Sequence, residues 1–407
     1  MEKKQVLVIG KVWPEPASSA AGMRMMQLIA FFKEQDYKVH FCSAAKPTPY
    51  SVNLNEHSID CSEILLNDAS FDDFVKKLQP AITLFDRFTT EEQFGWRVHQ
   101  KCPDSFLLLD TEDLHSLRAN REQALKKKNE SSLLSDITIR ELSSILRCDA
   151  SIIISQTELQ LLCEEFSLPK HLLLYLPLLN DAPQGFPLKD FDERNHFISL
   201  GNFLHAPNKD SVLYLRDVIW PLIHKQLPQA KMQVYGAYAD EAVMQWSQPK
   251  SNFFVLGRAE SAEEVMQSAR VCLAPLRFGA GQKGKLVLAM QCKTPSVTTS
   301  IGAESMCNKD QWPGFVCDDP HDFADKAVAL YQSKTTWQLA QAKCDKALEA
   351  FDKHTHLQQF KIEFDALQKN YHVNRTKNIA GQLLRYHANH STRYMALWIE
   401  AKNKLNT

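Results

Sequence analysis

The sequence predicts an α/β protein made of two doubly wound parallel-sheet domains in succession, followed by helices. Three observations predict this arrangement. Short runs rich in Val, Ile and Leu recur along the chain, and such unbroken runs suit strands that are buried on both faces of a parallel sheet. Amphipathic segments with helix-start signals lie between the runs. Near residue 180 the alternation stops, and it begins again near residue 197.

Length, composition and charge bound the class of protein. The 407 residues are 44% hydrophobic and 23% charged, and the formal net charge of -1 excludes a surface that is basic throughout. No apolar stretch approaches the ~18–20 residues of a transmembrane helix, so we expect no membrane span. The run at residues 6–9 is too short for a signal-peptide core and is expected to be the first strand. The 10 cysteines form no C-x-x-C pair, which favours reduced thiols and a cytoplasmic protein.

The first domain is expected to span residues 1–180. Helices are predicted after Ser70 and after Thr90, and Thr157 with Gln160 has the spacing of a capping box. Strands alternating with such helices indicate a doubly wound sheet. The predicted strands are residues 6–9, 39–42, 82–85, 106–109, 152–154 and 172–176.

The second domain is expected to span residues 195–370, after a turn-rich linker at residues 180–187. Ser261 and Glu264 form a second capping-box pattern, before a helix at residues 262–269. Helices are also predicted at residues 322–333 and 336–370. The predicted strands are residues 197–200, 232–235, 253–256, 271–276, 296–299 and 315–317.

A basic helical segment, residues 371–407, ends the chain. Its net charge is +5, because Glu400 is its only acid. The pattern suits either a solvated helix face or a patch that binds an anionic partner, and we expect its cations on the outer face. The basic residues are Arg375, Lys377, Arg385, Arg393, Lys402 and Lys404.

The loop at residues 274–285 is the strongest candidate for chemistry. It reads Ala-Pro-Leu-Arg-Phe-Gly-Ala-Gly-Gln-Lys-Gly-Lys and lies between a buried strand and the predicted helix 286–292. Gly279 and Gly281 allow the backbone to approach a ligand closely. Arg277, Lys283 and Lys285, with the N-terminus of the helix, suit a phosphate or diphosphate. The alternative is a tight turn with solvated lysines.

Polar residues of the first half form a second group of candidates. Gly22 and Arg24 open a helix after the first strand, where the glycine would face bound phosphates or would merely start a helix. Other polar residues follow the predicted strands 82–85 and 106–109, where ligands of doubly wound sheets bind. They would order or deprotonate a substrate hydroxyl, or would cap helices. These residues are Asp86, Asp110, Asp113 and His115.

The sequence resembles the retaining GT-B glycosyltransferases related to glycogen synthase and to bacterial group 1 sugar transferases. The loop 274–285 with Ala289-Met290 carries this resemblance, and it extends over residues ~195–330. Further similar segments are residues 199–202, 207–208, 220–223, 294–299 and 302–304.

The resemblance implies a GT-B fold, with the nucleotide-sugar in the second domain and the acceptor in the first. The final helices would pack back on the first domain. The substrate would be a nucleoside diphosphate sugar, with no further cofactor, and the acceptor a hydroxyl of unknown identity, for which an anionic glycan, a lipid headgroup or RNA are candidates. The oligomeric state is left open.

We expect Asp113, His115 and Lys285 to act in catalysis and His115, Asp113, Asp110 and Asp86 to meet the acceptor. The expected donor-binding residues are Gly22, Arg24, Arg277, Gly279, Gly281, Lys283, Lys285 and Glu304.

Four positions depart from the family pattern. Ala280 and Leu288 stand where the family usually has two glutamates, and Asn202 and Pro207 stand where Arg and Lys often occur. Asp110-x-x-Asp113 is not the Asp-x-Asp of metal-dependent transferases, so we expect no metal. Two alternatives to a glycosyltransferase therefore stay open: a GT-B binding protein without turnover, and an isomerase or hydrolase of nucleotide sugars.

Overall fold

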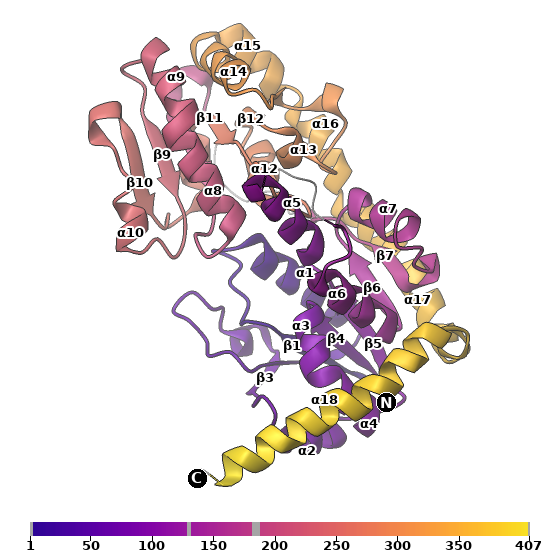
Figure 1. The fold of residues 1–407 in the computed structure, drawn as a ribbon. Coiled ribbons are helices and arrows are strands. Elements are labelled where there is room, and N and C mark those ends of the chain that lie inside the picture. The colour runs from indigo at the N-terminus through magenta and orange to yellow at the C-terminus, as the bar shows by residue number, and fades with distance from the viewer. Residues whose placement is uncertain (1–2, 128–131, 181–187, 406–407) are drawn as a thin grey trace.

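The computed structural model describes residues 3–127, 132–180 and 188–405. Figure 1 shows two α/β domains one above the other, with the last two helices lying along the first domain. Most of the linker predicted at residues 180–187 lies outside the described residues. The domain that contains residues 5–175 is called the first domain below, and the one that contains residues 195–348 the second.

The first domain is built on a seven-stranded parallel sheet with strand order β3-β2-β1-β4-β5-β6-β7. Apolar side chains on both of its faces are buried, as the unbroken Val, Ile and Leu runs predict. The strands are β1 (Gln5–Gly10), β2 (Lys38–Ser43), β3 (Asp60–Glu63), β4 (Ile82–Asp86), β5 (Phe106–Asp110), β6 (Ala150–Ile153) and β7 (Leu173–Tyr175).

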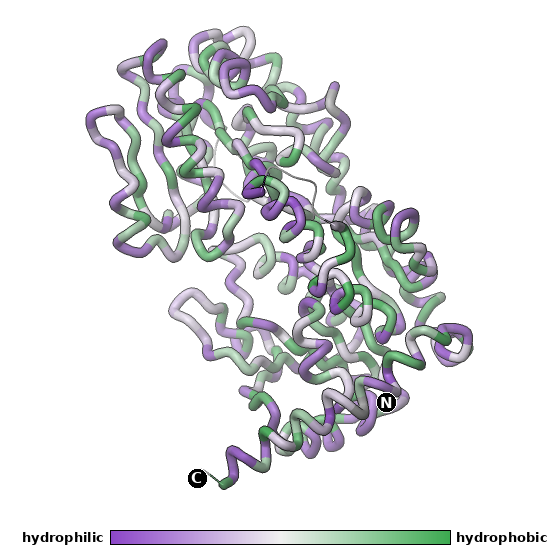
Figure 2. Tube along the Cα trace, viewed as in Figure 1, coloured by the Kyte–Doolittle hydropathy of each residue, from purple (hydrophilic) through white to green (hydrophobic). Residues whose placement is uncertain are grey.

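The second domain repeats the design with a six-stranded parallel sheet of order β10-β9-β8-β11-β12-β13. Figure 2 shows the apolar segments gathered along the strands inside each domain. The strands are β8 (Asn195–Leu200), β9 (Met232–Tyr235), β10 (Phe253–Gly257), β11 (Ala269–Ala274), β12 (Ser296–Thr298) and β13 (Gly314–Val316).

Helices cover the two sheets. Those of the first domain are α1 (Ala20–Glu34), α2 (Ser70–Leu78), α3 (Phe88–Thr90), α4 (Trp96–Lys101), α5 (His115–Lys127), α6 (Asp136–Arg147) and α7 (Gln156–Glu164). Those of the second are α8 (Ala206–Tyr214), α9 (Trp220–Gln226), α10 (Glu241–Met244), α11 (Ala262–Ser268), α12 (Gly284–Gln291), α13 (Ser300–Ala303), α14 (Pro320–Gln332), α15 (Lys334–Gln341) and α16 (Cys344–Leu348). The chain ends in α17 (Lys353–Lys377) and α18 (Ile379–Leu405).

Two helix starts show how capping decides a boundary. Ser261 caps α11 as predicted, because its side chain accepts a hydrogen bond from the N–H of Glu264. The capping box predicted at Thr157 is wrong. Ser155 caps α7 instead, by accepting from the N–H of Glu158 at 3.3 Å.

Helices α17 and α18 pack on the first domain. Phe360 and Phe364 of α17 lie in the core of the first sheet, although the predicted second domain runs to residue 370. The side chains of Arg375 and Arg385 both bond the buried carboxylate of Asp149, at 2.6 Å and 3.2 Å. The expectation that Arg385 lies on the outer face is therefore wrong, because a buried carboxylate requires a partner charge.

Candidate active site

The glycine-rich loop joins β11 to α12 at the carboxyl end of the second sheet, and it presses against the first domain. At Gly281, where φ is 62°, a Cβ atom would come within 2.9 Å of the Cβ atom of Asp113. At Gly284 it would come within 2.6 Å of Ala20, at the start of α1. The loop is therefore held where the two domains meet, and glycine at both positions permits the close approach.

Lys283 and Lys285 differ in what they contact. Nζ of Lys283 donates to the backbone oxygens of Ala280 and Gly281, at 3.3 Å and 2.7 Å, so its charge is tied to its own loop. Nζ of Lys285 donates to the side-chain oxygen of Asn208 at 2.8 Å, a neutral partner. Burial lowers the pKa of each lysine to about 8. Lys285 thus supplies a cation in the first turn of α12 that donates to a neutral amide.

Arg277 does not join this pair. Its guanidinium forms an ion pair with Asp210 of α8 and lies 4.8 Å over the ring of Tyr214. Both partners belong to the second domain, and the carboxylate of Asp210 neutralises the charge that the sequence assigned to the donor phosphates. A donor contact for Arg277 stays a prediction, because it would require this guanidinium to exchange Asp210 for the ligand.

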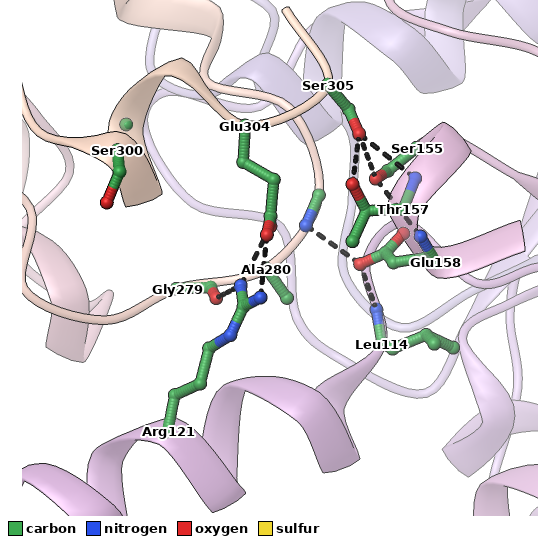
Figure 3. A network of polar contacts seen from close by, with 12 residues as sticks. Leu114, Arg121, Ser155, Thr157, Glu158, Gly279, Ala280, Ser300, Glu304 and Ser305 are labelled. Atoms are coloured by element: carbon green, nitrogen blue, oxygen red, sulfur yellow. Dashed lines mark hydrogen bonds and ion pairs between the residues drawn. The ribbon is translucent and has the colours of Figure 1, made fainter. Parts of the chain in front are cut away.

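Glu304 links the domains. Both of its carboxylate oxygens accept hydrogen bonds from Arg121 of α5, at 2.8 Å and 2.7 Å, and the same guanidinium donates to the backbone oxygen of Gly279 at 2.8 Å (Figure 3). This bidentate geometry is the strong form of an ion pair. The expected donor carboxylate therefore serves as the partner of Arg121, which sequence reasoning missed.

Glu158 and Ser305 add further links between the domains (Figure 3). Oε1 of Glu158 accepts from the N–H groups of Leu114 and Gly281, at 2.9 Å and 2.8 Å. The hydroxyl of Ser305 is 2.8 Å from that of Thr157, and it accepts from the N–H of Thr157 at 3.0 Å. Loop and first domain are thus fixed to each other by polar contacts.

A separate contact joins the domains through Tyr238, which follows β9. The Tyr238 hydroxyl donates to the Glu15 carboxylate at 2.6 Å, and its ring lies edge-on to Tyr50 with centroids 5.4 Å apart. Arg258 of the second domain lies 4.8 Å over the Tyr50 ring. The two domains are therefore joined on both the Glu158 side and the Tyr238 side.

Arg24, Asp110 and Gly22 contact other residues of the protein. The buried guanidinium of Arg24 pairs with Asp110 at 3.0 Å and donates to the Leu176 carbonyl at 2.9 Å. The N–H of Gly22 donates to Ser19, and a Cβ there would come within 2.4 Å of the Glu15 backbone. The polar groups of these three residues are thus engaged within the protein here. The donor contacts of Gly22 and Arg24 and the acceptor contact of Asp110 stay predictions.

Asp86 is also engaged. Its carboxylate accepts from the N–H of Lys11 at 2.9 Å and lies 3.2 Å from the Arg87 guanidinium. Burial raises the pKa of Asp86, and Arg87 opposes the shift. Arg87 has a φ of 70°, uncommon for a residue other than glycine and typical of functional sites. Lys11 and Arg87 thus bring two cations to this edge of the sheet, and sequence reasoning did not single out Lys11.

Asp113 and His115 lie together. Nε2 of His115 is 3.5 Å from the Asp113 carboxylate, which also pairs with Arg118. Burial would raise the pKa of Asp113, but Arg118 and the nearby histidines outweigh it and lower the pKa to about 2. Burial lowers the pKa of His115 to about 3, against the pull of Asp113. Asp113 is therefore ionised and His115 neutral, and a pKa of about 3 makes His115 a weak base.

Glu112 is the carboxyl group that the sequence did not reveal. Its φ is 64°, and its Oε1 has no hydrogen-bond partner within the described part of the chain. Burial, followed by the charge of Asp110, raises its pKa to about 8. A carboxyl group with a raised pKa at the carboxyl end of a strand suits acid–base chemistry. Its left-handed backbone is a property that sequence patterns do not show.

Charges from both domains meet at His205, which precedes α8. Loss of solvent and the charges of Arg118 and Lys285 lower its pKa, while Asp113 opposes them. The first-domain group around Asp113 is therefore close to the second-domain group around Lys285. A cavity of about 390 Å³ lies elsewhere, between α18 and the first domain, and is lined by Trp96, Arg140 and Met395 among others. None of the candidate residues lines it.

Comparison with known proteins supports the resemblance to GT-B glycosyltransferases. Residues 194–333 match the sequence model of the family Glycosyl transferases group 1. No curated protein sequence matches the chain. Sucrose-phosphate synthase from Thermosynechococcus elongatus is similar in structure, with 15% identity and a TM-score of 0.67, over 90% of this chain and 99% of that one.

Two further solved structures share the fold. The pneumococcal O-GlcNAc transferase GtfA, in complex with UDP and GlcNAc, is 13% identical with a TM-score of 0.64, over 90% of this chain and 99% of that one. A mutant of S. aureus TarM, in complex with fondaparinux, alpha-GlcNAc-glycerol and UDP, is 13% identical with a TM-score of 0.57, over 72% of this chain. This chain spans 58% of the length of TarM. The second domain therefore belongs to the group 1 glycosyl transferases, and the chain as a whole has the GT-B fold.

Proposed function

We propose that the chain is a glycosyltransferase that moves a sugar from a nucleoside diphosphate donor to a hydroxyl acceptor, with retention at the anomeric carbon and without a metal ion. The observation that carries the proposal is the position of Lys285. It lies in the first turn of α12, behind the glycine-rich loop, and its charge acts on His205, as does that of Arg118 from the first domain. The match of residues 194–333 to a glycosyltransferase family supports the same reaction.

Lys285 would stabilise the negative charge that grows on the diphosphate as the glycosidic bond breaks. Preorganised cations in a water-poor site do this without moving at the moment of reaction. Its pKa of about 8 leaves Lys285 mostly protonated at neutral pH, and a bound diphosphate would raise that pKa further. Lys11 and Arg87 on the facing edge are suited to help. The proposal needs no metal because these side chains supply the positive charge.

Glu112 would take the proton of the acceptor hydroxyl. A base works best when its pKa is near the working pH, which favours Glu112, at about 8, over His115, at about 3. Asp113 keeps the role of an ionised group that orients the acceptor, and His115 can accept a hydrogen bond in its neutral form. Contacts between the domains, such as Arg121 with Glu304, would exclude water that otherwise hydrolyses the donor.

A binding protein without turnover is the second candidate, and Leu288 favours it. Leu288 packs against the apolar cluster of Ile198 and Cys292, where a carboxylate is usual in the family. Ala280 at the other glutamate position is buried. The nucleotide would then be held by the loop and Lys285, and the sugar would lack its usual carboxylate partner.

Two measurements separate these functions. Calorimetry with UDP tests the nucleotide site, and UDP is the first probe because the similar structures of GtfA and TarM contain it. Consumption of nucleotide sugars, with and without a hydroxyl acceptor, then tests turnover. Consumption that requires an acceptor supports a transferase, binding without consumption supports a binding protein, and consumption without an acceptor supports a hydrolase or isomerase.

A further inference from the structure

The outward face of α18 is apolar and exposed. Ile379, Leu383, Tyr386, Tyr394 and Trp398 are each between 57% and 63% exposed. They are separated by four, three, eight and four residues, which places them along one side of an α-helix. Leu405 extends the same side to the end of the helix and is 87% exposed.

The opposite face of α18 fixes the helix to the first domain, so the apolar side cannot turn inward. Ala396 is buried, and Nε of Arg385 donates to the carbonyl of Arg147 at 2.6 Å. Glu400 is also buried and lies 3.7 Å from the guanidinium of Arg97. Figure 1 shows α18 as a long helix along the outer side of the first domain, ending beyond it.

The charges of α18 complement an anionic surface. Its only acid, Glu400, faces inward, so no carboxylate of the helix lies on the outer side. Arg393 lies 6.0 Å over the ring of Tyr394, and Lys402 lies 5.3 Å over that of Trp398, so both cations accompany exposed aromatic rings. Such cations beside Tyr, Trp and Leu are typical of helices that lie in the headgroup region of a bilayer.

We propose that the outer face of α18 binds the surface of a bilayer that contains anionic lipids. At 1.5 Å per residue the helix is about 40 Å long, enough to lie flat along the headgroups. No helix in the described part of the chain is long and apolar enough to cross a membrane. In a symmetric contact between two copies, Arg393 and Lys402 of one copy would approach the same cations of the other, and these like charges would repel. The charges therefore favour lipid over a second copy as the occupant of this face.

Flotation of the full chain with lipid vesicles tests the proposal. Binding to phosphatidylcholine vesicles that contain phosphatidylglycerol should exceed binding to pure phosphatidylcholine vesicles and should weaken with salt. Leu383→Gln with Trp398→Gln should reduce binding at least tenfold. Leu256→Gln with Leu339→Gln changes two exposed leucines of the second domain and should leave binding unchanged. Arg393→Gln with Lys402→Gln should reduce it by about fivefold per cation.

Three results would overturn the proposal. In the first, the wild-type chain fails to float with the anionic vesicles. In the second, the Leu383→Gln, Trp398→Gln variant binds the vesicles as well as the wild type does. In the third, the wild type binds no vesicles and forms a lipid-free dimer that is lost in this variant. Circular dichroism shows whether the variant is folded, and Leu383→Met with Trp398→Phe keeps the face apolar and should retain binding. The assay contains no nucleotide sugar, so its outcome is independent of the proposed transfer reaction.

Discussion

Oε1 of Glu158 in the first domain accepts a hydrogen bond of 2.8 Å from the N–H of Gly281 in the second. The same oxygen accepts from Leu114 at 2.9 Å, and Oε2 has no partner among the described residues. Burial, and then the charge of Asp113, raises the pKa of Glu158 to about 8. Glu158 is therefore mainly protonated at neutral pH while it holds the glycine-rich loop against the first domain.

Glu158 makes stability depend on pH. Because its pKa is higher in the folded chain than the 4.5 of an exposed glutamate, the folded state binds the extra proton, and its contribution to stability is lost as pH rises from about 4.5 through about 8. Glu158→Gln keeps the oxygen that accepts both N–H groups but cannot ionise. Above pH 8 the variant should be more stable than the wild type, by roughly 5 kcal/mol at most. Denaturant unfolding at a series of pH values measures this, and parallel curves for the two proteins would contradict it.

The ion pair between Arg121 and Glu304 should hold the domains together. Arg121→Gln leaves a half-buried carboxylate with one strong partner fewer, and this should weaken the contact by about 1–2 kcal/mol, or roughly 5- to 30-fold in the ratio of closed to open forms. Small-angle scattering should show a larger radius of gyration. The double variant Arg121→Gln, Glu304→Gln removes both charges and should recover part of the loss. Unchanged scattering by Arg121→Gln would show that other contacts hold the domains.

The pH dependence of the transfer rate should differ according to whether Glu112 or His115 is the base. If Glu112 is the base, the rate should rise as pH passes through about 8, because the carboxyl group must ionise. Glu112→Gln should remove this rise and lower the rate by about 10²-fold or more, with nucleotide affinity unchanged. His115→Ala should slow transfer without moving the profile, because the His115 ring, with a pKa of about 3, is neutral throughout. A pH profile that survives Glu112→Gln assigns the base elsewhere.

Arg385 and Arg393 of α18 should differ in their effect on stability. Arg385→Gln removes a buried partner of Asp149 and should lower the free energy of unfolding by about 1–3 kcal/mol. Arg393→Gln changes a partly exposed residue and should cost less than about 0.5 kcal/mol. Denaturant unfolding of both variants provides the comparison. Equal losses would mean that the ion pair with Asp149 adds no stability.

The strands were largely predictable because burial on both faces demands unbroken apolar runs. All the predicted strands are present, and their ends lie within a few residues of the predicted ends. Only β3, with the sequence Asp-Cys-Ser-Glu, was missed among the described strands. It is an edge strand whose residues are half-buried or exposed, so no apolar pattern marks it. Ser155 and Thr157 both suit a helix cap by composition, and the backbone path decided between them.

The segments that form the candidate site were predictable from the sequence, but the ion pairs between their residues were not. The ends of β4 and β5 lie at one edge because the two strands are parallel neighbours in one sheet. The loop 274–285 of the other sheet meets this edge where Gly281 lies against Asp113. The sequence could not show that Arg24 pairs with Asp110, 86 residues away, or that Arg121 pairs with Glu304, 183 residues away. These pairings depend on how the helices and domains pack, which local patterns do not encode.

Calorimetric titration of the Lys285→Ala variant with UDP, beside the wild type, tests the central claim most directly. Lys285 is assigned to the diphosphate, and a hydrogen bond to a charged group contributes about 1.5–3 kcal/mol, so the variant should bind at least tenfold more weakly. Lys250→Ala, in an exposed turn of the same domain, should bind like the wild type, and all three proteins should unfold at similar temperatures. Equal UDP affinity for the wild type and Lys285→Ala would contradict the assignment, and no binding by the wild type would contradict a uridine nucleotide site in this chain.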